Sequence, residues 1–94
     1  MRKYELVCIF HPDLDEAAFT AALEKVQGWV VEAGGSVDKV DIWGRKRLAY
    51  IIRKQKEGQY VLLNVTLPPA AVAVLDQNLR FLESIMRYLL TLVD

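Results

Sequence analysis

Residues 43–50 read Trp43-Gly44-Arg45-Lys46-Arg47-Leu48-Ala49-Tyr50, and this basic stretch joins a cluster of positive charge to an apolar segment. The apolar segment continues through Ile52. Three more cations then follow, at Arg53, Lys54 and Lys56. Half of the chain's twelve basic residues therefore lie between positions 45 and 56. A cationic β-hairpin mounted on a buried strand suits a polyanionic partner, but the same charges also keep an exposed hairpin soluble and protect its edge from pairing.

The sequence before the basic stretch predicts a strand and a helix. Residues 3–10 are rich in β-branched and aromatic side chains and end before Pro12, which favours a strand. Asp13 with Glu16 three residues later is the pattern of a helix N-cap with a capping box. Apolar residues then follow helical spacing until Gly34-Gly35. We expect the helix over residues 14–33.

The sequence around and after the basic stretch predicts three more strands and a second helix. A strand covers 36–43 and continues through 48–52, with Gly44 marking a bulge or a bend. The predicted further elements are a turn at 53–58, a strand at 59–67, a helix at 69–81 that begins after Pro68, and a strand at 83–93.

The resulting order, β-α-β-β-α-β, predicts one α+β domain over residues 1–94 with the ferredoxin-like split βαβ fold. In that fold, right-handed crossovers place both helices on one face of a four-stranded antiparallel sheet. Side chains alternate between the faces of a strand, so the purely apolar set that contains Leu6 and Cys8 should face the helices. The opposite, open face then carries an apolar patch, which favours a protein partner there. The residues expected in this patch are Val7, Ile9, Tyr60, Leu62 and Leu89.

Composition argues against enzyme chemistry. The net charge is zero, and the chain has one cysteine, Cys8, and one histidine, His11. These cannot form an internal disulfide or a plausible zinc site. No glycine-rich phosphate loop opens a helix. We therefore expect no catalytic residue, no metal and no cofactor. The start of the chain carries no signal core, and no apolar run is long enough to span a membrane, which favours the cytoplasm.

The basic stretch, together with Arg2-Lys3-Tyr4-Glu5 and Pro12-Asp13-Leu14, resembles the bacterial family of small-ribosomal-subunit protein six. The likeness extends over nearly the whole chain in one register. It implies a ferredoxin-like structural protein of the ribosome that binds the central domain of small-subunit ribosomal RNA as a heterodimer with small-subunit ribosomal protein eighteen. Positions that match the family's RNA contacts are Arg2, Tyr4, Lys54, Arg80 and Arg87.

The resemblance leaves two roles open. Arg45, Lys46 and Arg47 match the family motif, and they could either contact RNA or shape the hairpin. Tyr4 could contact RNA or belong to the core. Two other functions also fit the fold class. A ferredoxin-like homodimeric enzyme or small-ligand sensor would need polar groups at the centre of its sheet, where only Glu5 and Asn64 stand. An interaction module with no nucleic-acid partner is the other alternative.

Overall fold

The computed structural model describes residues 1–93 and has the predicted order of helices and strands. Four strands and two α-helices follow one another as expected, with one short 3-10 turn leading into the second helix. Their bounds are β1 Arg2–Phe10, α1 Glu16–Glu32, β2 Ser36–Ile52, β3 Gln55–Leu67, a 3-10 turn Pro69–Ala71, α2 Val72–Arg80 and β4 Ile85–Leu92.

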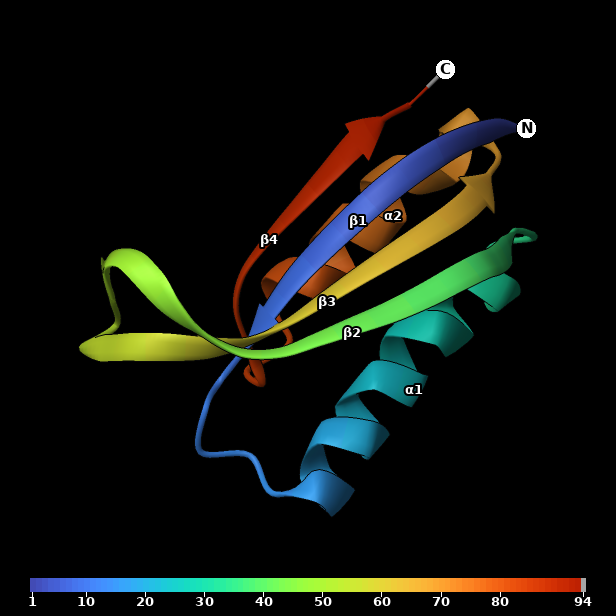
Figure 1. The fold of residues 1–94 in the computed structure, drawn as a ribbon. Helices are drawn as coiled ribbons and strands as arrows, with labels where there is room; N and C mark the ends of the chain where they lie inside the picture. Colours follow the sequence, from blue (N-terminus) through green and yellow to red (C-terminus); the bar gives the residue numbers. More distant parts are fainter. Residues whose placement is uncertain (94) are drawn as a thin grey trace.

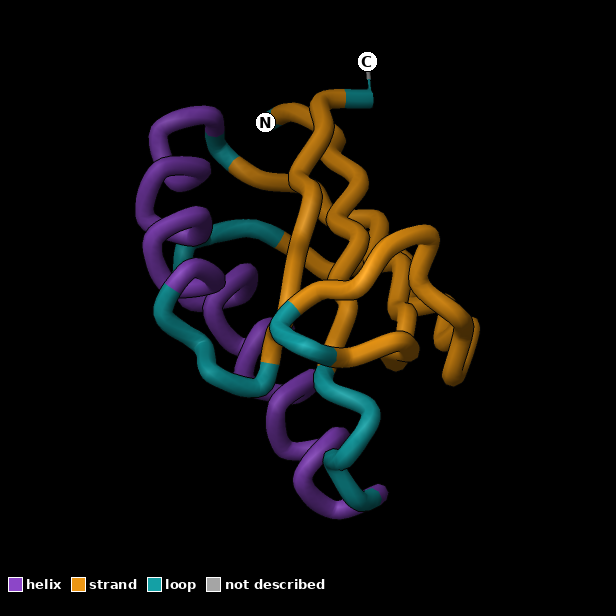
Figure 2. The backbone as a smooth tube through the Cα atoms, turned by 90° about the vertical axis from the view of Figure 1, so that its left-hand side faces the viewer, coloured by secondary structure: helices purple, strands orange, loops and turns teal. Residues whose placement is uncertain are grey.

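The four strands form one antiparallel sheet in the order β2-β3-β1-β4, with β2 and β4 at the two edges. Both helices pack behind this sheet and leave its other side uncovered (Figures 1 and 2). The predicted ferredoxin-like α+β fold is therefore confirmed. We call the uncovered side the open face.

The hydrophobic core lies between the sheet and the helices, and strand alternation selects its residues as predicted. Leu6, Cys8 and Phe10 of β1 are fully buried, whereas Val7 and Ile9 between them are half-buried on the open face. In β3 the core residues are Val61, Leu63, Val65 and Leu67. Helix α1 covers them with Ala22, Leu23, Val26 and Val30, and α2 adds Leu75 and Leu79. This packing fixes which residues remain on the open face.

Helix α1 begins two residues later than predicted, and its N-cap is Asp15 rather than Asp13. The Asp15 carboxylate accepts a hydrogen bond from the backbone N–H of Ala18 at 2.8 Å. The backbone N–H of Leu14 instead bonds to the carbonyl of His11, so the turn that follows β1 extends past Asp13. No capping box forms, because the residue three positions after Asp15 is an alanine.

The β2–β3 hairpin is tighter than predicted. Its loop is Arg53-Lys54 alone, because Ile52 already pairs with Gln55. Both loop residues have positive φ, 50° and 65°, as in the type I′ turn whose twist suits a two-residue hairpin. Gly58 is not part of the turn. It is buried within β3, where an added Cβ would lie 2.3 Å from Cγ2 of Ile9.

Gly44 forms the predicted irregularity in β2, and the structure shows that it is a β-bulge. Ile42 pairs with Val61 and Gly44 pairs with Tyr60, so Trp43 between them has no partner on β3. Gly44 has a φ of +82°, a conformation that a side chain would strain. The bulge therefore adds one residue to β2 at the beginning of the basic stretch.

Candidate functional site

The β2–β3 hairpin extends beyond the other two strands and curls over the open face. Strand β1 pairs with β3 only as far as Gln59, which lies opposite Arg45. Residues 45–57, which we call the hairpin tip, therefore project from the sheet, at the end opposite the two termini (Figure 1). The projection brings the basic stretch next to the apolar patch predicted from strand alternation.

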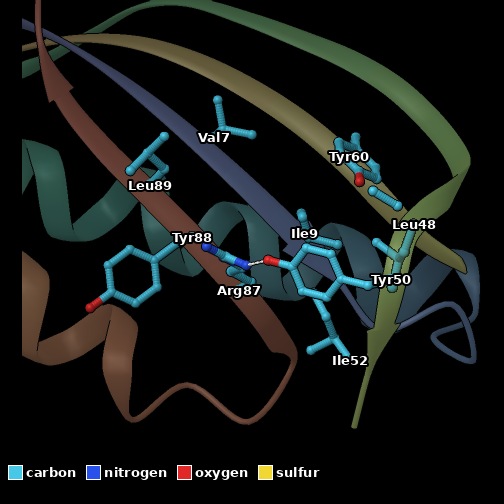
Figure 3. Close-up of a pocket in the computed structure, with 10 residues that line it drawn as sticks. Val7, Ile9, Leu48, Tyr50, Ile52, Tyr60, Arg87, Tyr88 and Leu89 are labelled. Atoms are coloured by element: carbon cyan, nitrogen blue, oxygen red, sulfur yellow. Dashed lines mark hydrogen bonds between the residues drawn. The ribbon is translucent and has the colours of Figure 1, made fainter. Parts of the chain in front are cut away.

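An apolar pocket of about 260 Å³ lies where the hairpin tip meets the open face (Figure 3). All four strands contribute to its lining. Four of the five predicted partner-binding residues line it, namely Val7, Ile9, Tyr60 and Leu89. The fifth, Leu62, is half-buried in β3, where it pairs with Val7. The structure therefore gathers the whole predicted patch on one face, around a concave centre.

Arg87 closes one side of this pocket through a contact with Tyr50. The Arg87 guanidinium donates a hydrogen bond to the Tyr50 hydroxyl (Figure 3) and lies 5.7 Å from the centre of that ring. Tyr50 belongs to β2 and Arg87 to β4, the two opposite edge strands. The contact thus ties the hairpin tip across the end of the sheet, and it places one cation beside the apolar patch.

The basic stretch divides its cations between the two sides of the sheet. Lys46 lies on the open-face side, with its ammonium 5.4 Å from the centre of the Trp43 ring. Arg45 lies on the helix side, where it donates a 2.7 Å hydrogen bond to the carbonyl of Pro12 and approaches Glu57 at 4.0 Å. Arg45 therefore fastens the hairpin to the loop after β1, which is a role in shaping the hairpin.

A second, more polar hollow lies on the helix side of the hairpin tip. Cations from both strands and the turn surround it, and they include three of the residues considered for RNA binding, Arg45, Arg47 and Lys54. Its lining consists of Pro12, Asp13, Arg45, Arg47, Lys54, Gln55, Lys56 and Glu57. Together, the cations of this hollow and Lys46 on the open-face side give the hairpin tip positive charge on both of its faces. Positive charge on both faces favours binding of a polyanion.

The other predicted RNA-binding residues lie away from the hairpin tip. Arg2 begins β1 at the opposite end of the sheet (Figure 1). Arg80 ends α2 and pairs with Asp76 at 2.9 Å. Tyr88 donates a 2.8 Å hydrogen bond to the same carboxylate, and burial raises the pKa of its phenol. Tyr4 is only 9% exposed and packs in the core, so the structure supports the core alternative for this residue.

The sequence pattern does not identify Trp43 and Tyr50 as residues of this site, although both belong to the basic stretch. Trp43 is 43% exposed and stacks against Tyr60, with ring centres 6.4 Å apart and planes within 14°. Gly44 next to Trp43 is the feature of the sequence that could have indicated this residue, because a glycine in a strand suggests a bulge and a bulge redirects the side chains beside it. Tyr50 gave no such signal, since its contact with Arg87 joins residues 37 positions apart.

The described residues form neither a cluster of metal-ligating side chains nor a helix that could span a membrane. Across residues 1–93 there is no group of three or more His, Cys, Asp or Glu side chains placed to hold a metal ion. None of the helices in the same range is long and apolar enough to cross a membrane.

Comparison with known proteins identifies the family. The model of the family described as ribosomal protein S6 matches residues 3–91. The small ribosomal subunit protein bS6 of Nocardia farcinica is 51% identical over 87 residues, which cover 93% of this chain and 92% of the relative. The bS6 protein of Moorella thermoacetica is 42% identical over 94 residues, covering 100% of this chain and 96% of the relative.

A solved structure extends the likeness to the fold. The 30S ribosomal protein S6 of Thermotoga maritima superposes with a TM-score of 0.93 at 27% sequence identity, covering 98% of this chain and 87% of that one. The resemblance inferred from the basic stretch is confirmed, and so is the expectation that the chain is not an enzyme. The chain belongs to the ribosomal protein S6 family, whose members are structural proteins of the small ribosomal subunit.

Proposed function

We propose that this chain binds small-subunit ribosomal RNA on cytoplasmic ribosomes as a heterodimer with small-subunit ribosomal protein eighteen. The observation that carries the proposal is the junction of two surfaces. The cationic hairpin tip meets an apolar open face around the pocket bounded by Tyr50 and Arg87. One surface has the character of a phosphate-binding site, and the other has the character of a protein interface.

The RNA side of the proposal rests on the local concentration of cations. The chain as a whole has no net charge, so attraction to RNA depends on where its charges lie. Lys46, Arg47, Lys54 and Lys56 are all exposed on the hairpin tip. Each phosphate contact by such a cation releases condensed counterions, which makes the affinity depend steeply on salt. These contacts position the protein on RNA without reading its sequence.

The partner side of the proposal rests on the exposed apolar surface. Leu89 is 63% exposed on the edge strand β4, beside the half-buried apolar residues of β1 and β3. Arg87 lies at the rim of the same pocket, and its guanidinium can donate hydrogen bonds to either a phosphate or a carboxylate. A protein seated here would bury the patch next to the cations of the hairpin tip. We expect the heterodimer to bind RNA more tightly than either chain alone.

A binding titration tests this function. The purified chain, protein eighteen and their mixture would each be titrated against a fragment of the central domain of small-subunit ribosomal RNA at 50 mM and 200 mM salt. We expect tight binding only by the mixture, with an affinity that falls by at least tenfold between the two salt concentrations. Tight binding by the isolated chain at physiological salt would contradict the heterodimer.

Single substitutions test the proposed contacts. Arg87→Ala and Arg2→Ala should each weaken binding of the heterodimer to the RNA fragment and should lower the salt dependence by about one phosphate contact. Lys25→Ala on α1 is the matched control, because it removes an exposed cation from the helix side of the molecule. Unchanged RNA affinity in both arginine variants would remove these residues from the interface.

A further inference from the structure

We infer that Trp43 is a stacking platform for one unpaired nucleobase of the bound RNA. The inference deepens the proposed function and rests on it, because it names a contact made by the same cationic surface. The indole is 43% exposed on the open-face side of an edge strand, beside the hairpin tip. Phosphate contacts alone would not require an aromatic ring at this place.

The β-bulge sets the position of the indole. Trp43 is the extra residue between Ile42 and Gly44, which both pair with β3, and Trp43 itself has no partner residue on β3. Bulges bend a strand and redirect a side chain, and they are over-represented beside functional sites. The φ of Gly44, +82°, is a conformation that glycine adopts without strain and that a residue with a side chain would not. The bulge therefore depends on a conformation that favours glycine, and it directs the aromatic ring next to it.

The indole is also held in place from two directions. Its Nε1–H donates a 3.1 Å hydrogen bond to the carboxylate of Asp41. One side of the ring stacks against Tyr60, whose plane is within 14° of parallel. A ring held in this way loses little conformational freedom when another planar group stacks on it, which favours binding. The hydrogen bond also engages the Asp41 carboxylate.

The charge around the ring favours a nucleobase over an apolar side chain of a protein. The Lys46 ammonium lies 5.4 Å from the ring centre, at a distance typical of a cation–π contact. A nucleobase that stacks on the indole beside Lys46 would displace the ammonium from the ring, but it would also bring a phosphate with which Lys46 can pair. An apolar partner would instead displace Lys46 without compensating its charge. Aromatic stacking with adjacent cations is how proteins hold single-stranded RNA.

Paired changes in the protein and the RNA test the inference. The wild-type chain, Trp43→Phe and Trp43→Leu, each in complex with protein eighteen, would be titrated against the RNA fragment. In a second series of RNA fragments, an abasic nucleotide would replace each unpaired nucleotide in turn. We expect Trp43→Leu to weaken binding about fivefold to a hundredfold, and Trp43→Phe to weaken it less. One abasic position should cause a similar loss and should cause no further loss in the Trp43→Leu complex.

Controls separate the possible failures. Phe81→Leu changes an aromatic ring that is 73% exposed after α2, and it should leave RNA affinity unchanged. Two results would overturn the stacking inference and leave the proposed function intact. One is that Trp43→Leu binds the RNA fragment as tightly as the wild type. The other is that every abasic position weakens binding by the Trp43→Leu complex as much as binding by the wild-type complex. Weaker binding of Trp43→Leu to protein eighteen without RNA would assign the indole to the protein interface and also overturn it. Failure of the wild-type heterodimer to bind the RNA would overturn both.

Discussion

At the scale of single residues, Cys8 shows how burial fixes the chemistry of a side chain. The thiol is fully buried in β1, and burial raises its pKa from 9.0 to about 12. The reason is desolvation, because the thiolate would lose its hydration inside the core. Cys8 therefore behaves as a small apolar residue, as the sequence predicted, and it offers no nucleophile at neutral pH.

The raised pKa of Cys8 predicts a pH dependence of stability. The folded state holds the thiol proton more tightly than the unfolded state, so the stabilisation is complete below about pH 9 and is lost as the pH rises toward 12. Within that window the free energy of unfolding should fall by about 1.4 kcal/mol per pH unit because of this group. Urea unfolding at successive pH values measures the slope.

Cys8→Ala is the control for the pH experiment. This variant lowers stability by a constant amount because it leaves a small cavity, but it has no thiol to ionise. The difference in unfolding free energy between the wild type and Cys8→Ala should therefore shrink above pH 9. The tyrosines titrate in both proteins and cancel in the difference. Parallel curves throughout pH 8–11 would contradict the raised thiol pKa.

At the scale of elements, the start of α1 distinguishes two neighbouring acidic residues. Asp15→Ala should lower the free energy of unfolding by about 1 kcal/mol, because it removes the acceptor for the Ala18 backbone N–H. Asp13→Ala should change it by less than about 0.5 kcal/mol, since Asp13 is exposed and caps nothing in α1. Urea unfolding of both variants checks this prediction, and a larger effect at Asp13 would contradict the observed cap.

The β2–β3 hairpin gives a second pair of neighbours with different roles. Arg45→Ala should destabilise the protein by about 1 kcal/mol, because it removes a charge-assisted hydrogen bond to the Pro12 carbonyl at a partly exposed site. Arg47→Ala, two residues along the same strand, should change stability by less than about 0.5 kcal/mol. Hydrogen exchange in residues 45–57 should accelerate only in Arg45→Ala, and equal protection in both variants would contradict the fastening role.

The elements also show what the sequence could and could not predict. Strand alternation correctly divided β1 and β3 into core and open-face residues, because side chains alternate with a fixed period. The cap of α1 was misplaced, since both Asp13 and Asp15 are chemically able to cap and the preceding turn decides between them. Gly44 indicated a bulge. The contacts of Trp43 with Tyr60 and of Tyr50 with Arg87 depend on how far the hairpin curls, which no local pattern encodes.

At the scale of the whole molecule, the fold places an apolar surface and a cationic surface next to each other. Both helices cover the same face of the sheet, so the open face remains available for a partner (Figure 2). The long β2–β3 hairpin bears the cations and extends beyond the other two strands. It then curves back, so that part of β2 lines the pocket on the open face. The proposed binding of RNA by a chain with no net charge is consistent with this arrangement, because the local charge of the hairpin tip matters more than the total charge.

The proposed partner surface leads to a prediction about coupled stability. Protein eighteen at a concentration one hundred times its dissociation constant should raise the free energy of unfolding of this chain by about 2.7 kcal/mol, since it binds only the folded state. Leu89→Asp places a charge in the apolar patch, at a side chain that is 63% exposed. We expect this variant to fold with near wild-type stability alone and to lose most of the stabilisation by the partner.

Val74→Asp is the matched control, because Val74 is 59% exposed on α2, away from the open face. Both substitutions add one carboxylate to an exposed aliphatic position, so they change the net charge equally. Only Leu89→Asp puts that charge where the partner must exclude water, and burying an unpaired carboxylate is costly. Thermal unfolding with increasing protein eighteen compares the two variants directly. Equal stabilisation of both by the partner would show that the open face is not the interface, and unequal stabilisation in the opposite order would move the interface to the helix side.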